Sequence, residues 1–390
     1  MEDQFFFQLQ TQTFYGIGIS KNIGIFLREK NFNKLVILVD EGVVSKSNYF
    51  EEIRNVIRHN ANILETIILR GTEEPDYDYL DEIAQRIRKI EKVDLIIGIG
   101  GGSCLDITKA VAVLKTNPGK GIDYRGFDKV RFPGIPTVAI PTTAGTGSEV
   151  TINAVFTDKK EMRKLGINGK FMNATFAFLD AEWTISCPYN VAISSGMDAL
   201  THALESFMCK KSNELTKVFS KNAFKLLYGA LPSLVDDPEN KIERQKLLLG
   251  SFLAGIALFN SGSGIAGALS YPIGVYFKVP HGIAGGIFLK SVLEYNVERG
   301  YFGYDELYDV IESGDNIRSS REKSFLFINK LDYLFKKLKV PEYLDQWGIT
   351  KQNVHDLAKL MQPLQAAFDQ NPIPFSATTD ALNLLKKHVR

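Results

Sequence analysis

Two of the five histidines in this chain lie in patterns that suit metal binding. In Gly-Met-Asp-Ala-Leu-Thr-His, Asp198 and His202 are four residues apart, so a helix places both on one face. His281 follows a long uncharged stretch, in Val-Pro-His-Gly. One carboxylate and two imidazoles are the ligand set of a catalytic divalent site with open positions. By spacing alone, Asp198 and His202 also fit an ordinary surface pair. The remaining histidines are expected to be exposed: His59, His355 and His388.

A glycine cluster at residues 98–106, Gly-Ile-Gly-Gly-Gly-Ser-Cys-Leu-Asp, stands where a predicted strand passes into a predicted helix. Glycine lets the backbone approach a phosphate closely, and a helix N-terminus offers unpaired N–H groups and the positive end of a dipole. Ser103 is expected either to cap this helix or to donate to a phosphate oxygen. Tight strand–helix turns also use glycine, so simple packing is the alternative interpretation.

A second loop rich in small polar residues, Pro-Thr-Thr-Ala-Gly-Thr-Gly-Ser-Glu-Val at residues 141–150, follows the next predicted strand. Its hydroxyl groups and glycines predict a hydrogen-bonding cradle. Asp40 also follows a strand, and ligands of open α/β sheets gather beyond the carboxyl ends of the strands. We therefore expect the three segments to converge on a dinucleotide. Asp40 would bind a ribose diol and repel a 2′-phosphate, which favours NAD over NADP, unless it only caps a helix.

Short apolar runs alternate with amphipathic segments over the first 180 residues. This alternation predicts a parallel sheet covered on both faces, in a Rossmann-like α/β fold. After residue 187 helical periodicity continues to the end. We therefore predict a dinucleotide-binding α/β domain over residues 1–185 and an all-helical metal-binding domain over residues 186–390. The expected strands are residues 35–39, 63–69, 93–99, 135–140 and 174–180, and the expected helices include residues 50–57 and 80–90.

Composition argues against several classes of partner. The 46 Lys and Arg residues nearly balance 45 Asp and Glu residues, so no broad nucleic-acid surface is expected. Three cysteines are too few for a disulfide framework, and the acidic N-terminus does not resemble a signal peptide. Both features indicate a cytoplasmic protein. Glycines and a proline interrupt the uncharged stretch 247–277, which favours a buried helix pair over a membrane span.

Four motifs occur in the order found in the iron-containing (group III) alcohol dehydrogenases, and the chain resembles that family over nearly its whole length. The motifs are Gly-Gly-Gly-Ser at 100–103 with Asp106, the polar loop at 141–149, Gly-Met-Asp-Ala-Leu-Thr-His at 196–202 and Pro-His-Gly at 280–282. The resemblance implies a divalent metal, zinc or iron, on Asp198, His202 and His281, and an NAD or NADP cofactor. The implied cofactor-binding residues besides Asp40 are Gly100, Gly101, Gly102 and Ser103 at the pyrophosphate, Thr142, Thr143 and Leu179 at the adenosine half, Ser148 and Lys164 towards the nicotinamide, and Asp106 in the first motif.

Two positions depart from the family pattern. Members usually carry a His-x-x-x-His pair ahead of the last ligand, at the positions where this chain has Gly267 and Tyr271. One usual ligand is therefore missing, together with the histidine often assigned to proton relay. Asp198, His202 and His281 with a water still complete a zinc site, whereas ferrous iron would be held less firmly. Tyr271 is expected to contact substrate or relay a proton, or else simply to pack.

The resemblance implies a metal- and NAD-dependent oxidoreductase that oxidises a hydroxyl group of a small polyol or sugar acid. The altered ligand set is similar to that of a sugar-oxidising branch, which implies oxidation of the C8 hydroxyl of 3-deoxy-D-manno-octulosonate in lipopolysaccharide biosynthesis. Two alternatives stay open. One is a dehydroquinate-synthase-like lyase, which would need more basic residues and histidines. The other is a non-catalytic NAD- or sugar-binding protein with a decayed metal site. These residues leave open whether the protein forms a homodimer and whether it is an oxidase or a dehydrogenase.

Overall fold

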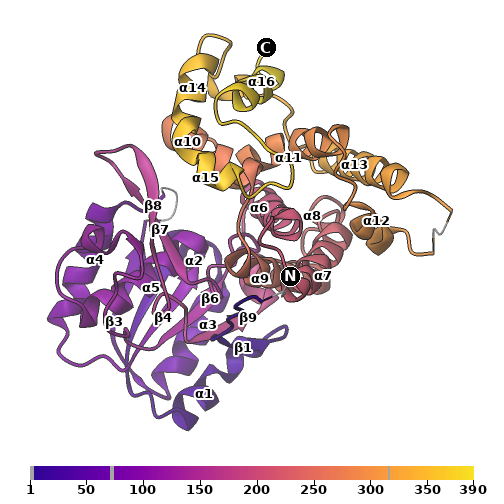
Figure 1. Cartoon of the computed structure of the whole chain (residues 1–390). Helices are drawn as coiled ribbons and strands as arrows, with labels where there is room; N and C mark the ends of the chain where they lie inside the picture. The colour runs from indigo at the N-terminus through magenta and orange to yellow at the C-terminus, as the bar shows by residue number, and fades with distance from the viewer. Residues whose placement is uncertain (1–3, 71–73, 315–316) are drawn as a thin grey trace. The chain divides into compact units, whose positions relative to one another are not determined.

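Two compact units make up the chain, and neither unit is one continuous segment. The computed structural model describes residues 4–70, 74–314 and 317–390. The α/β unit consists of Leu9–Val191 and Glu239–Leu248, and the helical unit of Met1–Gln8, Ala192–Pro238 and Leu249–Arg390. Figure 1 follows the chain from indigo to yellow through both units. The long segment of the α/β unit ends at Val191, and the chain continues in the helical unit from Ala192. The domain limit between residues 185 and 186 stays a prediction.

Six parallel strands form the main sheet of the α/β unit, in the order β1–β9–β6–β4–β2–β3. All five strands predicted from the apolar runs are present, which confirms the parallel α/β fold. The sixth strand, β1, lies at the edge and is short, and no apolar run marks it in the sequence. The strands are β1 (Gln12–Tyr15), β2 (Lys34–Asp40), β3 (Asn62–Leu69), β4 (Leu95–Gly100), β6 (Thr137–Pro141) and β9 (Phe176–Leu179).

Both faces of this sheet are buried, as the uninterrupted apolar runs predict. In β2, Val36 and Leu38 belong to the core on one face, whereas the alternate residues Leu35, Ile37 and Val39 belong to the core on the other. Helices α4 and α5 pack on the first face, and α1 and α3 on the second. Their bounds are α1 (Ile23–Glu29), α3 (Asn48–Arg58), α4 (Tyr77–Lys89) and α5 (Gly102–Thr116).

A second, three-stranded sheet in the same unit was not predicted. It pairs β5 (Gly126–Phe127), β8 (Arg163–Asn168) and β7 (Asn153–Asp158), with β7 and β8 antiparallel. β7 alternates buried and half-buried residues, and β8 is mostly half-buried. Because neither strand is a continuous apolar run, the pattern that revealed the main sheet does not mark them.

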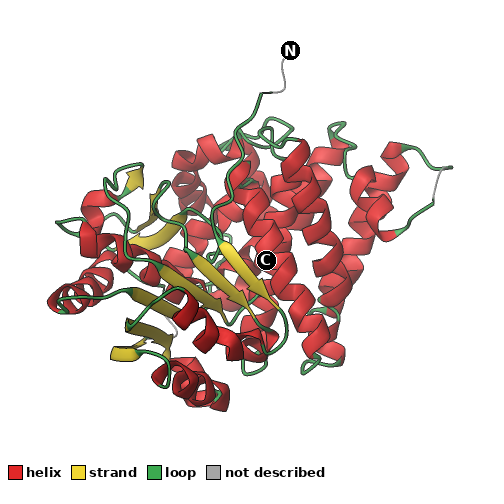
Figure 2. Ribbon diagram, turned by 90° about the horizontal axis from the view of Figure 1, so that it is seen from below, coloured by secondary structure: helices red, strands yellow, loops and turns green. Residues whose placement is uncertain are grey.

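Outside the α/β unit, the described residues that form regular structure are helical, which confirms the expected helical C-terminal part; Figure 2 draws helices red and strands yellow. The helices are α6 (Tyr189–Met208), α7 (Glu214–Ala230), α8 (Ser233–Asp236), α9 (Lys241–Asn260), α10 (Ile265–Phe277), α11 (His281–Glu298), α12 (Asp305–Ile311), α13 (Ser320–Lys337), α14 (Val354–Met361), α15 (Gln365–Phe368) and α16 (Thr379–Lys387). Of these, α6, α10 and α11 carry the residues expected to bind metal.

The uncharged stretch 247–277 forms most of α9 and all of α10, as the expected helix pair. Among the residues that the structure describes, no single helix has both the length and the apolar character needed to cross a bilayer. The two helices meet that requirement only when taken together, and they bend by 101° at the break between them. Most of α10 is buried, including the stretch from Ile265 to Ser270.

Candidate active site

The three residues expected to bind metal come together in the helical unit. Asp198 and His202 lie one turn apart on α6, and His281 is the first residue of α11. Asp198 Oδ1 lies 3.4 Å from His202 Nε2 and 3.7 Å from His281 Nε2. One ligand atom from each residue lies within 4.8 Å of the other two. The interpretation of Asp198 and His202 as a simple surface pair is therefore wrong, because Asp198 is buried and a third donor joins them.

Gly282 explains how α11 comes close enough to α6 for the ligands to meet. A Cβ atom at Gly282 would lie 1.8 Å from the carbonyl oxygen of Ser194 and 2.9 Å from Cβ of Asp198. No side chain fits at that distance, so the glycine after His281 is a requirement of the helix contact. The Pro-His-Gly motif thus combines one ligand with the residue that permits its approach.

The donor chemistry of this cluster fits a divalent cation. A buried carboxylate needs a cationic or hydrogen-bonding partner, and Asp198 faces two imidazole nitrogens. One carboxylate and two histidines serve both in open zinc sites, with water as a further ligand, and in non-haem Fe(II) sites. Nδ1 of His202 is buried and has no hydrogen-bond partner among the described residues, so no contact there fixes the tautomer of this ring.

At position 267, where the resemblance implies another ligand, the carboxylate of Glu205 takes the available space. Glu205 is fully buried and accepts hydrogen bonds from the backbone N–H groups of Gly264, at 2.7 Å, and Gly267, at 3.0 Å. A Cβ atom at Gly267 would lie 2.8 Å from Glu205 Oε2. Burial raises the pKa of the Glu205 carboxyl, and the two N–H groups oppose that rise. Tyr271 follows one turn later, with its ring centroid 5.0 Å from that of His281, so it borders the cluster.

The three segments expected to hold a dinucleotide converge in the α/β unit. A Cβ atom at Gly100 would lie 3.0 Å from Cβ of Asp40, and one at Gly102 would lie 2.5 Å from Cγ2 of Thr146. The N–H of Thr142 also donates to the carbonyl of Gly100 at 3.0 Å. The glycines therefore permit close packing of the segments, as the alternative interpretation proposed. They also leave the N-terminus of α5 without a side-chain cap at Gly101.

Asp40 caps α2 (Glu41–Lys46), because its Oδ1 accepts the N–H of Gly42 at 2.7 Å. Burial raises the pKa of the Asp40 carboxyl, while the hydrogen bond from Gly42 lowers it. The alternative prediction, that Asp40 caps a helix, is therefore confirmed. Its contact with a ribose stays a prediction.

Asp106 and Ser148 bind each other, and a residue that the sequence patterns did not single out joins them. Asp106 accepts from Ser148 Oγ at 2.5 Å and from the N–H of Val155 at 2.8 Å. Lys109, one turn further along α5, is 2% exposed and lies 3.5 Å from Asp106. Its ammonium donates to three backbone carbonyls, those of Ser148, Thr151 and Asn153, at 2.8, 3.2 and 2.5 Å. Together the two α5 side chains hold the polar loop and the strand that follows it.

The remaining expected cofactor residues lie in varied surroundings. Thr142 and Leu179 are buried, and Thr143 is half-buried with its hydroxyl 3.4 Å from a Cβ built at Gly101. Ser103 is exposed in the first turn of α5 and does not cap it, which corrects one of its two expected roles. The ammonium of Lys164, on β8, pairs with the carboxylate of Glu74. Direct contacts of these residues with a nucleotide stay predictions.

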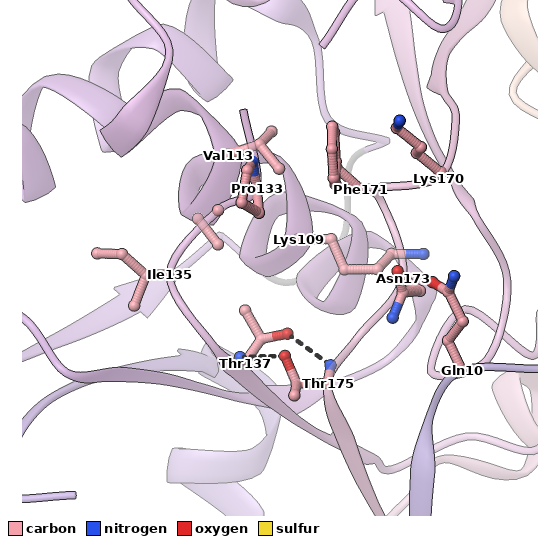
Figure 3. A pocket seen from close by; sticks show the side chains of 12 residues that line it. Gln10, Lys109, Val113, Pro133, Ile135, Thr137, Lys170, Phe171, Asn173 and Thr175 are labelled. Atoms are coloured by element: carbon pink, nitrogen blue, oxygen red, sulfur yellow. Dashed lines mark hydrogen bonds between the residues drawn. The ribbon is translucent and has the colours of Figure 1, made fainter. Parts of the chain in front are cut away.

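A separate cavity of about 270 Å³ lies at the amino ends of β6 and β9 (Figure 3). Thr137 and Thr175 exchange two hydrogen bonds along its wall, at 3.1 and 3.3 Å. Lys109 contributes to its lining from α5, as do Lys170 and Asn173 from the loop before β9. The expected cofactor segments follow the carboxyl ends of the strands, so this cavity belongs to the opposite end of the sheet.

One histidine expected at the surface is instead buried. His388 is 8% exposed, with Nδ1 2.7 Å from the carbonyl oxygen of Glu342 and Nε2 3.0 Å from Ser291 Oγ. Its ring stands edge-on to Phe288. Its nearness to the C-terminus misled the sequence interpretation, because both polar partners come from distant segments. His59 and His355 are exposed, as expected.

Comparison with known proteins matches both parts of the chain to one family. The model of the iron-containing alcohol dehydrogenases matches residues 10–181, and the C-terminal model of the Fe-containing alcohol dehydrogenase family matches residues 192–389. The chain belongs to the iron-containing alcohol dehydrogenase family. It is therefore an oxidoreductase, and the metal and nicotinamide cofactor implied by the resemblance agree with this assignment.

Relatives of this iron-containing alcohol dehydrogenase cover most of its length. It is 30% identical to the NAD-dependent methanol dehydrogenase of Bacillus methanolicus over 88% of this chain and 90% of that protein. It is 32% identical to the lactaldehyde reductase of Escherichia coli K12 over 71% of each chain. Among solved structures, an alcohol dehydrogenase from Oenococcus oeni has the same fold, with a TM-score of 0.91 at 24% identity over 99% of this chain and all of that one.

Proposed function

We propose that this enzyme oxidises a hydroxyl group of a small polyol or sugar acid and transfers the hydride to NAD. The observation that carries the proposal is the cluster of Asp198, His202 and His281, whose ligand atoms lie within 4.8 Å of one another in a member of this family. The α/β unit would hold NAD, which would supply the acceptor for a hydride from the carbinol carbon, and the hydroxyl proton would pass to solvent. The products are a carbonyl compound and NADH.

The three ligands would hold a divalent metal, which supplies Lewis acidity that lowers the pKa of a bound hydroxyl group. Asp198 contributes the single negative charge of the ligand set, so a bound divalent cation would leave the site with a net positive charge. Tyr271 lies beside His281, and we place its side chain against the substrate. Zinc is the metal we propose, because three protein ligands and water complete its usual catalytic site.

For the cofactor, we propose that the uncapped N-terminus of α5 and residues 100–103 bind the pyrophosphate of NAD. Asp40, at the end of β2, would bind the adenosine ribose and disfavour the 2′-phosphate of NADP. Thr142, Thr143 and Leu179 would border the adenosine half, with Ser148 and Lys164 towards the nicotinamide. The support is the convergence of these segments and the likeness to a relative described as NAD-dependent.

As the individual substrate we propose 3-deoxy-D-manno-octulosonate, a sugar acid of lipopolysaccharide, which the enzyme would oxidise at its C8 hydroxyl group. The support is the altered ligand pattern at Gly267 and Tyr271, which is similar to that of a sugar-oxidising branch of the family. We also propose that the enzyme works in the cytoplasm, a reducing compartment that suits its three free cysteines.

Metal analysis and cofactor reduction test this function directly. Purified protein would be assayed for bound metal and for absorbance at 340 nm with NAD or NADP and a panel of alcohols, polyols and sugar acids that includes 3-deoxy-D-manno-octulosonate. We expect about one metal ion per chain and substrate-dependent NADH formation. Oxygen uptake without accumulation of NADH would identify an oxidase. Absence of metal and of turnover after reconstitution with zinc, iron or manganese would favour the non-catalytic alternative.

Two histidine variants separate the metal site from general effects. His281→Ala removes a proposed ligand, and we expect metal content and activity to fall by at least about 100-fold. His355→Ala replaces an exposed histidine of α14 and serves as the matched control, with metal and activity unchanged. Equal metal content in the two variants would remove His281 from the site.

A further inference from the structure

The cavity at the amino ends of β6 and β9 takes no part in the proposed reaction, and two residues of its lining carry unused hydrogen-bond donors. The hydroxyl oxygens of Thr137 and Thr175 each accept the backbone N–H of the other residue, at 3.3 and 3.1 Å (Figure 3). A hydroxyl group can accept and still donate its own hydrogen. Within the part of the chain that the structure describes, neither hydroxyl group donates to an acceptor. A molecule in the cavity would therefore meet two O–H donors.

The burial of these two threonines makes their donors costly to leave unpaired. Thr137 is 2% exposed, and Thr175 is half-buried. A buried donor without an acceptor costs free energy, because the folded protein has taken it out of water. Asn173 adds an amide group to the same lining, from the loop before β9 (Figure 3). An acceptor group with two oxygen atoms would satisfy both hydroxyl groups at once.

The charges around the cavity favour an anion. Lys170 lies at its rim, with the ammonium 4.8 Å from the ring centroid of Phe171 and directed away from the threonine pair (Figure 3). Among the described residues Lys170 has no ion-pair partner, and no residue of the cavity lining is acidic. Lys109, the other cation in the lining, lies 3.5 Å from Asp106, which balances its charge. Lys170 therefore gives the rim a positive potential, which attracts anions without contacting the threonines.

Much of the remaining lining is apolar, and the enclosed space is small. In Figure 3, Val113, Pro133 and Ile135 lie on the other side of the cavity from Lys170. Gln10 and Lys170 are exposed, so the cavity opens to solvent on their side. Pockets for drug-sized ligands have volumes of roughly 300–1,000 Å³. The volume of about 270 Å³ therefore suits a smaller molecule that has an apolar part.

We propose that this cavity is a second binding site, which takes a small organic carboxylate with an apolar group attached. The two carboxylate oxygens would accept from the hydroxyl groups of Thr137 and Thr175, and the apolar group would pack against Val113 and Ile135. Among the described residues of the lining, Lys170 is the one unpaired cation, so a carboxylate fits better than a doubly charged phosphate. The cavity and the expected cofactor segments belong to opposite ends of the sheet, so this site does not depend on the proposed oxidation.

Binding of benzoate to the metal-free protein tests the site directly. A ligand-detected NMR titration would compare benzoate with benzamide, which has nearly the same shape and no charge. We expect a dissociation constant on the order of 1 mM for benzoate, and binding at least about 10-fold weaker for benzamide. Removing the metal excludes the other partner that a carboxylate could find, a divalent cation at Asp198, His202 and His281. Loss of benzoate binding in the metal-free protein would assign it to that cation and overturn the cavity site.

Two variants of Thr175 separate its hydroxyl group from the shape of the cavity. Thr175→Val nearly keeps the volume of the side chain and removes the hydroxyl group, whereas Thr175→Ser keeps it. We expect benzoate to bind the valine variant at least about 10-fold more weakly than the natural protein, and the serine variant within about 3-fold. Melting temperatures would show that both variants are folded. Equal affinities of the two variants would overturn the role of the threonine pair.

Lys170→Met tests the charge at the rim in a surface turn, where loss of the fold is not expected. Lys160→Met is its matched control, because Lys160 is an exposed lysine in the turn between β7 and β8 and does not line the cavity. At low ionic strength we expect benzoate to bind Lys170→Met about 3-fold more weakly and the control as tightly as the natural protein. Failure of benzoate to bind the natural protein would overturn the site, whereas the metal and turnover assays decide the proposed function separately.

Discussion

A single methyl group at position 282 would separate the metal ligands. Gly282→Ala places a Cβ atom 1.8 Å from the carbonyl oxygen of Ser194, which is backbone and cannot move aside without shifting α6. We expect the free energy of unfolding to fall by about 3 kcal/mol and zinc affinity to be lost, because α11 must move away from α6. Thermal unfolding with and without zinc measures both effects.

Gly285→Ala is the natural control for that experiment. Gly285 lies one turn later on α11, and its added Cβ atom would meet the side chain of Thr201 at an ordinary 3.6 Å. Alanine is a better helix former than glycine, so this variant should be stabilised by about 0.5–1 kcal/mol and should bind zinc normally. Similar behaviour of the two alanine variants would contradict a specific role for Gly282.

Residue types and spacing predicted the metal ligands but not the buried lysine that holds the polar loop. Asp198, His202 and His281 were identified because histidine is scarce and because the family pattern names them. Lys109 was not, since a lysine within a helix carries no pattern of its own. Lys109 is buried because three carbonyls from one distant segment surround its ammonium, and such an arrangement exists only after folding.

At the level of elements, Lys109 joins α5 to the polar loop after β6. Lys109→Met keeps the length of the side chain and leaves three backbone carbonyls and Asp106 without their cation. We expect a loss of about 3 kcal/mol in stability and NAD binding at least about 10-fold weaker, because the loop loses its fixed position. Calorimetric titration with NAD and denaturant unfolding provide the two values.

Lys115→Met tests whether removing any ammonium group from α5 weakens NAD binding. Lys115 lies in the last turn of α5. Its ammonium also donates to three backbone carbonyls, those of Ile87, Arg88 and Ile90 at the C-terminal end of α4. This variant should lose stability but bind NAD as the natural protein does. NAD affinity reduced equally in both variants would show that Lys109 acts only through the stability of α5.

The elements themselves were predicted unevenly, and the reason lies in their burial. The central strands β2, β4 and β6 are covered on both faces, so they appear in the sequence as unbroken apolar runs. The edge strand β1 and the hairpin of β7 and β8 are partly exposed, and their mixed composition resembles that of loops. Among the helices of this unit, α3 and α4 were predicted from their amphipathic period, whereas the short helices α1 and α2 were not.

On the scale of the whole molecule, Glu149 should make stability depend on pH. Burial raises the pKa of this carboxyl to about 7, from an ordinary value of 4.5. Between these two values the unfolded chain releases the proton and the folded chain retains it. The free energy of unfolding should therefore fall as pH rises through this window, by about 3 kcal/mol in total. Below the window both states hold the proton, and above it the loss is complete.

Glu149→Gln tests this dependence, since glutamine cannot ionise. Denaturant unfolding at several pH values between 4.5 and 7 should give a flatter profile for this variant than for the natural protein. Glu91→Gln, at an exposed position before β4, is the control and should retain the natural slope. Identical slopes in the natural protein and in Glu149→Gln would show that the carboxyl ionises without cost.

The interleaving of the two units has a consequence for the order in which the protein is made. The last strand of the main sheet, β9, is complete at Leu179, but the carbonyl of Leu179 and the N–H of Ala181 both bond to the side chain of Gln245. Gln245 comes 64 residues after Ala181. On the ribosome the chain is produced from its N-terminus, so the first half must wait for those later residues before its final hydrogen bonds can close.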